Sequence, residues 1–222
     1  MVMEYAEGGN LADLLLKNRV VGRRFSPDQI LMYAAQLTLA LLAVHSNQIL
    51  HRDVKPQNIY IKEGVLKLGG FGVAKALASE SDMAEGKCGT PYYMPPEVCS
   101  GLAYDSKVDV WALGVVIFEL ITFRKPFTGN DINSLFRNIA NKPLEPLPSE
   151  AGGDLSLLVQ ALLTKDRDSR PSIQEVAQIA CIKDRIVKFA KEHDCADALQ
   201  ELYGSGMDRK PKVSTEGTPE EI

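Results

Sequence analysis

The sequence is poor in the residues that mark disulfide-linked, metal-binding and nucleic-acid-binding proteins. Its 222 residues include four cysteines, three histidines and one tryptophan. The cysteines form no C-x-x-C pair and have no metal-ligand spacing, so we expect reduced thiols, with Cys88 the most exposed of Cys88, Cys99, Cys181 and Cys195. Acidic residues outnumber basic ones, and the net charge of -4 argues against nucleic acid or an anionic membrane as the main partner.

Targeting and membrane-spanning patterns are also absent. The stretch from Met1 to Gly9 has no basic region and no apolar run, so we expect no signal peptide. The longest apolar stretch, Val108 to Thr122, is interrupted by Asp109 and Glu119 and is too short to cross a bilayer. It predicts a buried core helix. With 45% apolar and 24% charged residues, the composition is that of a globular protein large enough to bury a core.

The hydrophobic pattern predicts a mainly helical chain with one β-hairpin. Helical periodicity extends over residues 11–17, from Ser26 to about Asn47, and then over about 105–122, 131–140, 154–164 and 172–180. Ile59–Ile61 and Val65–Leu68 predict a hairpin that turns at Lys62–Gly64. A strand is expected at Val2–Tyr5, and an ordered loop over 69–96.

Two polar residues predict where the first helices begin. Asn10 follows Gly8 and Gly9 and is expected to cap the first helix. Ser26 precedes Pro27, and Gln29 is expected to complete a capping box. One face of the second helix is apolar: Ile30, Ala34, Leu37, Leu41 and Val44. Near the C-terminus, a further amphipathic segment is expected from the spacing of Ile182, Ile186, Phe189, Ala190 and Leu199.

The most informative stretch is His51 to Asn58, with Gly70-Phe71-Gly72 after it. The first block has the H-R-D, Lys and Asn pattern of a Ser/Thr kinase catalytic loop. The second block stands where such enzymes carry D-F-G, but a glycine replaces the Asp. Gly69–Gly72 could also be interpreted as a phosphate-binding loop, but no helix start follows it in the required way, so we favour a degenerate D-F-G.

Taken with further motifs, the chain resembles the C-terminal lobe of a protein kinase and is most similar to the NIMA-related (NEK) family. The motifs stand in the family's order: Val2–Tyr5 with Glu7-Gly8-Gly9, His51–Asn58, Lys67–Gly72, Gly89–Met94 with Pro96-Glu97, Asp109–Gly114, and Arg170-Pro171-Ser172. The resemblance implies a mainly α C-lobe with a small hairpin and an activation segment, part of the α+β kinase fold. The boundaries implied are a hinge remnant at 1–9, the C-lobe at 10–181, a helical extension at 182–203 and a disordered tail at 204–222.

The resemblance implies a catalytic role for four residues. Asp53 would accept the proton of the substrate hydroxyl, Lys55 would stabilise charge on the transferred phosphate, and Thr90 would hydrogen-bond near Asp53. Asn58 would hold Mg²⁺. For ATP, the resemblance implies Met3 as gatekeeper, Glu4 and Ala6 as partners of adenine, Asn10 near the ribose and Tyr60 at the pocket floor.

Other motif residues match structural positions of the family. Glu97 and Arg170 match an ion pair, Asp109 matches the residue that ties the central helix to the catalytic loop, and His51 matches a packed residue. We expect His45 and His193 at the surface or at helix ends. The core is expected to include Trp111, Leu113, Val116, Phe118 and Leu120.

Several departures from the family pattern bear on activity. Gly70 has no side-chain oxygen for Mg²⁺, and no glycine-rich loop or V-A-x-K lysine precedes the hinge. Val73-Ala74-Lys75 lies after F-G and cannot be that lysine motif. Gly86 occupies the position that is usually a phosphorylatable Thr or Ser in the activation segment. Substitutes are Ser79 or Ser81, or constitutive charge from Glu85 beside Arg52; Pro95 replaces the usual Ser of S-P-E.

Two hypotheses on function follow, and the sequence leaves enzymatic activity uncertain. In the first, the chain is a NEK-like pseudokinase that binds protein partners or substrates. In the second, it is an active ATP-dependent Ser/Thr kinase whose N-lobe is lost from a truncated gene model. Neither predicts nucleic acid or membrane as a partner, and the oligomeric state is open. Family association implies a cytoplasmic location, with cytoskeletal, centrosomal or ciliary placement.

Overall fold

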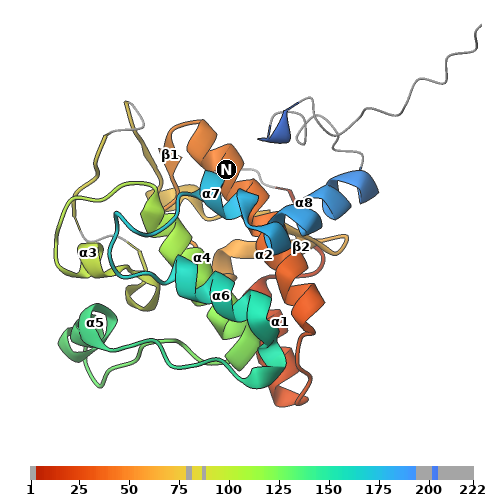
Figure 1. Ribbon diagram of the computed structural model, residues 1–222, viewed down its shortest axis with the longest axis horizontal. Helices are drawn as coiled ribbons and strands as arrows, with labels where there is room; N and C mark the ends of the chain where they lie inside the picture. The colour runs from red at the N-terminus through yellow and green to blue at the C-terminus, as the bar shows by residue number, and fades with distance from the viewer. Residues whose placement is uncertain (1–3, 79–81, 87–88, 194–201, 205–222) are drawn as a thin grey trace, which may run out of the picture. The chain divides into compact units, whose positions relative to one another are not determined.

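The computed structural model describes residues 4–78, 82–86, 89–193 and 202–204 (Figure 1). Contacts divide the chain into two units, residues 1–186 and 187–222. The predictions on Met3, Ser79, Ser81, Cys88, Cys195 and Leu199 lie outside the described residues, and so does the predicted tail at 204–222 beyond Gly204.

The first unit is mainly helical, as predicted. Its helices are α1 (Leu11–Val20), α2 (Pro27–Ser46), α3 (Pro96–Cys99), α4 (Lys107–Thr122), α5 (Ile132–Asn141), α6 (Gly152–Leu162), α7 (Ile173–Gln178) and the first part of α8 (Ala180–Glu192). Short 3₁₀ turns are η1 (Pro56–Asn58), η2 (Phe71–Val73), η3 (Pro91–Tyr93) and η4 (Ser149–Ala151). The strands are β1 (Ile49–Leu50), β2 (Ile59–Lys62), β3 (Val65–Leu68) and β4 (Lys75–Ala76).

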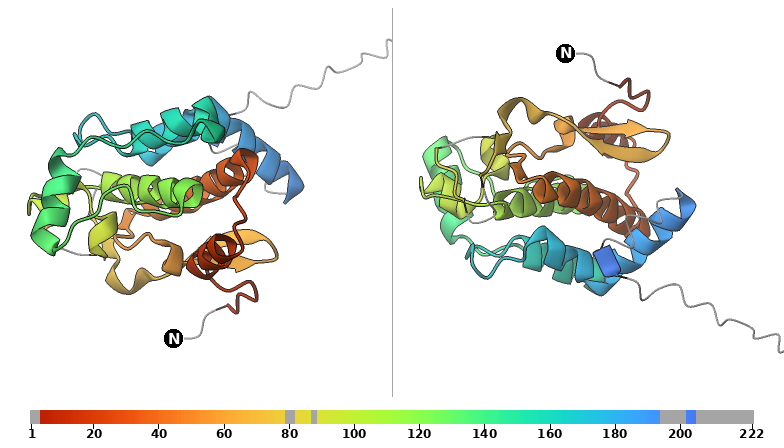
Figure 2. Two further views of the ribbon diagram at one scale, coloured as in Figure 1. Left: turned by 90° about the horizontal axis from the view of Figure 1, so that it is seen from below. Right: turned by 90° about the horizontal axis from the view of Figure 1, so that it is seen from above.

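Within this unit α2 and α4 form a central layer (Figure 2). The β2–β3 hairpin and α1 lie on one side of this layer, and α6 and α7 lie on the other. The predicted core residues of α4 are all buried: Trp111, Leu113, Val116, Phe118 and Leu120. At Gly114, an added Cβ would lie 2.8 Å from Leu162 Cβ, so α4 and α6 pack more closely than a side chain at 114 would allow.

Side-chain caps define the starts of α1 and α2. Asn10 Oδ1 accepts a hydrogen bond from the Asp13 amide (3.0 Å), as predicted. Ser26 Oγ accepts from the Gln29 amide (3.2 Å). The predicted capping box is wrong, because the Gln29 side chain donates forward to the Tyr33 hydroxyl (3.1 Å) instead of returning to Ser26. Ser172 and Glu175 form a capping box at the start of α7.

The hairpin is confirmed, with Glu63 and Gly64 at its turn. Both residues have positive φ (51° and 79°), which suits the tight turn between antiparallel strands. The segment before α1 packs against this hairpin, since Gly8 N–H donates to Ile61 O (3.0 Å) and Ile61 N–H donates to Gly9 O (2.9 Å). Glu4 and Tyr5, the described part of the predicted first strand, are not in a strand.

The loop expected over 69–96 contains a short strand that the sequence did not predict. Lys75 and Ala76 form β4, which pairs with Leu50 and Ile49 of β1 in an antiparallel ladder. Leu77 N–H extends it by donating to Gln48 O (2.8 Å). The beginning of this loop is therefore tied to the strand that leads into His51.

Among the described residues, α2 is the one helix long and apolar enough to cross a bilayer, and 61% of its apolar window is buried within the protein. That burial is typical of a core helix. In the second unit, α8 continues to Glu192 and the Phe189 ring stacks on His193 at 4.1 Å. The expected amphipathic segment is therefore helical as far as Glu192.

Candidate active site

The loop from His51 to Asn58 is anchored by a buried carboxylate from α4. Asp109 Oδ1 accepts from the Arg52 amide (2.8 Å), and Oδ2 accepts from the His51 amide (2.9 Å). Arg52 has a left-handed backbone (φ 65°), which is costly for a residue with a Cβ. The bonds to Asp109 offset that cost and hold the loop in one conformation.

His45 also bonds to Asp109. It lies in the last turn of α2, so its expected helix-end position is confirmed, but it is not at the surface. It is 7% exposed, and its Nε2–H donates to Asp109 Oδ2 (2.9 Å). His45 follows Leu41 by one helical turn on the buried face of α2, and this spacing is the signal that could have placed it inside. His193 is exposed, as expected.

Asp53 is the centre of a network that unites the predicted catalytic residues. Its Oδ1 accepts from Thr90 Oγ1 (3.1 Å), and its Oδ2 accepts from Lys55 Nζ (2.7 Å) and Asn58 Nδ2 (2.8 Å). Lys55 Nζ also donates to Thr90 Oγ1 (2.8 Å). The structure thus brings Asp53, Lys55, Asn58 and Thr90 together, with the lysine and the amide at one carboxylate oxygen and the hydroxyl at the other.

The Asn58 side chain, which bonds to Asp53, lies against Gly70. Asn58 Nδ2 donates to both the main-chain oxygen and the carboxylate of Asp53 (2.8 Å each). Gly70 has φ 82°, and a Cβ added to it would lie 2.3 Å from Asn58 Cγ. The observed position of Asn58 therefore requires glycine at residue 70, since any side chain there would displace it.

Tyr60 and Gly69 link this network to the predicted nucleotide end. A Cβ at Gly69 would lie 2.9 Å from the Tyr60 ring, and Tyr60 forms a β-bridge with Asn10. Asn10 also donates through Nδ2 to Asp13 (2.8 Å). Glu4 forms an ion pair with Lys62 and lies in the same segment as Ala6. The structure brings these residues to the hairpin, and their contacts with a nucleotide stay a prediction.

His51 connects the catalytic loop to the glycines. It is fully buried, its Nδ1 accepts from the Asp53 amide (3.3 Å), and its Nε2–H donates to Gly69 O (2.8 Å). The Phe71 and His51 rings pack in a T-shaped arrangement, with their centroids 4.8 Å apart. The predicted role of His51 as a packed residue is confirmed.

The segment after residue 89 is held by a buried ion pair. Arg170 donates through two nitrogens to Glu97 (2.7 and 3.0 Å), and their side chains are 0% and 6% exposed.

Arg52 donates to Val73 O (2.7 Å) and Tyr104 OH (3.4 Å). Within the described residues no carboxylate forms an ion pair with Arg52, and Glu85 is exposed, so the expected charge from Glu85 is not found there.

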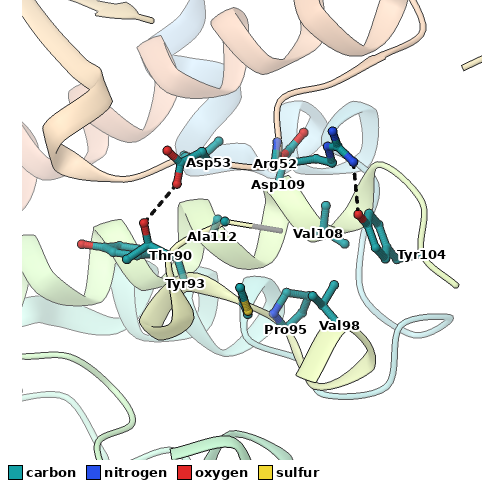
Figure 3. A pocket seen from close by; sticks show the side chains of 13 residues that line it. Arg52, Asp53, Thr90, Tyr93, Pro95, Val98, Tyr104, Val108, Asp109 and Ala112 are labelled. Atoms are coloured by element: carbon teal, nitrogen blue, oxygen red, sulfur yellow. Dashed lines mark hydrogen bonds between the residues drawn. The ribbon is translucent and has the colours of Figure 1, made fainter. Parts of the chain in front are cut away.

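A small cavity of about 20 Å³ lies beneath Asp53 (Figure 3). Its walls come from the catalytic loop, the segment from Gly89 to Val98 and α4, and Figure 3 shows Thr90 bonded to Asp53 and Arg52 bonded to Tyr104 at its edges. Three segments far apart in the sequence therefore meet at the Asp53 carboxylate.

The comparison with protein families matches this arrangement. The protein kinase domain family matches residues 1–181. The chain belongs to the protein kinase family. Its helical lobe, hairpin and Asp53 loop are accordingly those of a kinase C-lobe, and the predicted fold class is confirmed.

Similar proteins place this kinase homologue close to the NEK group. It is 36% identical to the serine/threonine-protein kinase Nek1 of Mus musculus over 98% of this chain and 18% of the relative. It is 38% identical to Nek5 of Homo sapiens over 85% of this chain and 27% of the relative. The predicted NEK resemblance is confirmed, and the chain spans about a fifth to a quarter of the length of these relatives.

Proposed function

We propose that this chain is a NEK-like Ser/Thr kinase homologue with impaired phosphoryl transfer that acts by binding protein partners. The observation that carries the proposal is Gly70, which stands where the family has a metal-binding Asp. A bound metal ion stabilises the transferring phosphate by several kcal/mol, so its loss lowers turnover by orders of magnitude. A cytoplasmic location, with cytoskeletal, centrosomal or ciliary association, belongs to the same proposal.

The residues present do not fit a Mg²⁺ ion well. Magnesium takes six oxygen ligands, of which proteins usually supply at least one carboxylate. Gly70 supplies no side-chain oxygen, and Asn58, whose Nδ2 donates to Asp53, has a single amide oxygen to offer. Among the described residues, no group of three His, Cys, Asp or Glu side chains could hold a metal ion. The family uses ATP together with Mg²⁺, and we infer that this chain binds Mg·ATP weakly because residue 70 supplies no carboxylate for the metal ion.

The alternative is an active ATP-dependent Ser/Thr kinase, and the contacts of Lys55 and Thr90 with Asp53 favour it. Lys55 and Thr90 hold the Asp53 carboxylate in place, and Asp53 is 16% exposed, within reach of a substrate hydroxyl. A positioned base of this kind is worth about 10²–10⁴-fold in rate. Residual activity would therefore depend on Asp53 rather than on a metal ligand at residue 70.

Transfer of labelled phosphate from Mg·ATP to a generic protein substrate separates the two functions. The natural gene product that carries this chain is compared with its Asp53→Asn variant, and we expect equal, background-level transfer. Transfer that Asp53→Asn abolishes would establish the active kinase instead.

Two substitutions at residue 70 locate the defect. Gly70→Asp adds a carboxylate and should raise transfer by about tenfold or more if the lost metal ligand limits turnover. Gly70→Asn displaces the Asn58 side chain in the same way but adds no charge, and it should leave transfer at background. No gain from Gly70→Asp would show that another feature limits activity.

A further inference from the structure

A partly buried charged cluster lies one turn beyond Thr90, and the chemistry at Asp53 does not use it. Glu119, near the end of α4, accepts through Oε2 from the Tyr93 hydroxyl (2.9 Å) and from Lys125 Nζ (2.5 Å). Lys125 Nζ also bonds to the Tyr93 oxygen and lies 4.2 Å from the centroid of the Tyr93 ring. One carboxylate, one ammonium and one phenol therefore share a single site.

The charges of this cluster are partly buried and balance each other. The side chains of Lys125 and Glu119 are 22% and 17% exposed. Burial lowers the pKa of the Lys125 ammonium, while Glu119 opposes this shift. Burial also raises the pKa of Tyr93, so its hydroxyl stays protonated and donates to Glu119. The negative charge of Glu119 is thus neutralised from within the chain.

The cluster adjoins the catalytic carboxylate. The Tyr93 amide donates to Thr90 O (2.9 Å) within η3, and Thr90 in turn bonds to Asp53. Asp53 is close enough for its charge to contribute to the raised pKa of Tyr93. Thr90 and Tyr93 also line the same cavity (Figure 3). A polypeptide segment bound in front of Asp53 and Thr90 would therefore present a neighbouring side chain to Tyr93 and Glu119.

We propose that Lys125 determines which partner side chains are accepted at the surface formed by Thr90, Tyr93 and Glu119. Its ammonium group already neutralises the Glu119 carboxylate there. A partly buried carboxylate beside a binding surface attracts an arginine or lysine of a partner. Here Lys125 already occupies that role, so the face accepts a partner segment with an uncharged side chain at this position. The inference rests on the proposed function, because it assumes that a protein segment binds beside Asp53.

The test measures binding of single amino-acid derivatives and so needs neither ATP nor an identified partner. Nα-acetyl-arginine amide and Nα-acetyl-norleucine amide are titrated into the isotope-labelled full chain, and the backbone amides near Tyr93 and Glu119 are followed by NMR. We expect no preference for arginine in the natural chain. In Lys125→Met the arginine derivative should bind about tenfold more tightly than the norleucine derivative, as expected for one recovered charge pair.

Two further variants serve as controls. Arg124→Met removes a neighbouring positive charge whose side chain is 68% exposed and has no bond to Glu119, so it should not create the preference. Adding Glu119→Gln to Lys125→Met should abolish the preference, because the carboxylate is then gone.

Lys125→Gln covers the case in which Lys125→Met does not fold, since glutamine keeps a donor for Glu119 while losing the charge. The inference is overturned if both Lys125 variants lack an arginine preference, or if the natural chain already has one as strong. A failed phosphotransfer experiment leaves this result unchanged, so the two proposals can fail separately.

Discussion

Two carboxylates organise the catalytic loop, and they differ in the kind of partners they have. Asp109 is 1% exposed and accepts from two backbone amides and a buried histidine. Asp53 lies at the surface of the loop and accepts from three side chains: Lys55, Asn58 and Thr90. Backbone partners are fixed by the fold, whereas side-chain partners can rotate away. The scaffold of the loop is therefore independent of residue 70, while the arrangement around Asp53 depends on it.

The largest effect is expected from the scaffold side of this comparison. Asp109→Asn should lower the free energy of unfolding by about 3–5 kcal/mol, because an amide cannot accept all three buried hydrogen bonds. Urea denaturation measures the loss. Asp28→Asn is the matched control, since Asp28 is 60% exposed in its ion pair with Arg185 and should cost about 1 kcal/mol or less. Similar costs for the two variants would contradict the assigned role of Asp109.

The buried Glu97–Arg170 pair should give the next largest effect. Arg170→Met leaves the Glu97 carboxylate buried without its partner and should cost about 3 kcal/mol. Replacing both residues, as in Glu97→Leu with Arg170→Met, removes that uncompensated charge and should cost less than Arg170→Met alone. Chemical denaturation of both forms tests this, and a double variant that is less stable than the single one would be inconsistent with it.

Substitution of Gly70 tests directly whether the side-chain arrangement around Asp53 depends on residue 70. Gly70→Ala should cost about 1–2 kcal/mol more than Gly64→Ala, because its Cβ also collides with Asn58. Gly64 has a similar φ (79° against 82°) and no atom within 4 Å of an added Cβ, so both alanines have the same backbone strain.

Thermal or urea unfolding of both alanine variants, with and without Asn58→Ala, isolates the contact. The excess cost of Gly70→Ala should disappear when Asn58 is also alanine. An excess that persists in that background would mean that Asn58 is not the group displaced.

The smallest expected effect is the response to magnesium. Millimolar Mg²⁺ should shift the melting temperature of the natural chain by less than about 1 °C relative to a salt of equal ionic strength, because an ion that does not bind the folded state cannot stabilise it. Gly70→Asp, which adds a carboxylate beside Asn58, is the comparison variant and should show a larger shift. A clear magnesium-dependent rise in the natural chain would reverse the conclusion about its metal site.

Much of the scaffold could be predicted from local sequence signals. Asn10 and Ser26 begin their helices as expected because capping needs contacts within a few residues. The hairpin followed from two short β-rich runs around a glycine turn. The β1–β4 pairing was missed because two-residue strands are too short to show a period.

Contacts between distant residues explain what the sequence did not predict at the site. His45 was expected at the surface or at a helix end; it lies at the end of α2, and its burial depends on Asp109, 64 residues further along the chain. The glycine at residue 70 was recognised as a lost ligand, but its contact with Asn58 appears in the folded chain alone. Lys125 lies in a loop without periodicity, so no sequence pattern pointed to its pairing with Glu119.

The close approach at Gly114 limits how this sequence can vary between related proteins. Because no side chain fits between α4 and Leu162 at that point, residue 114 is restricted to glycine while α6 keeps its present distance. Residues on α6 can change size only if they still pack against a bare backbone. Tolerated substitutions should therefore occur at exposed positions of α6, such as Leu157, whereas Gly114, which faces α6, should stay unchanged.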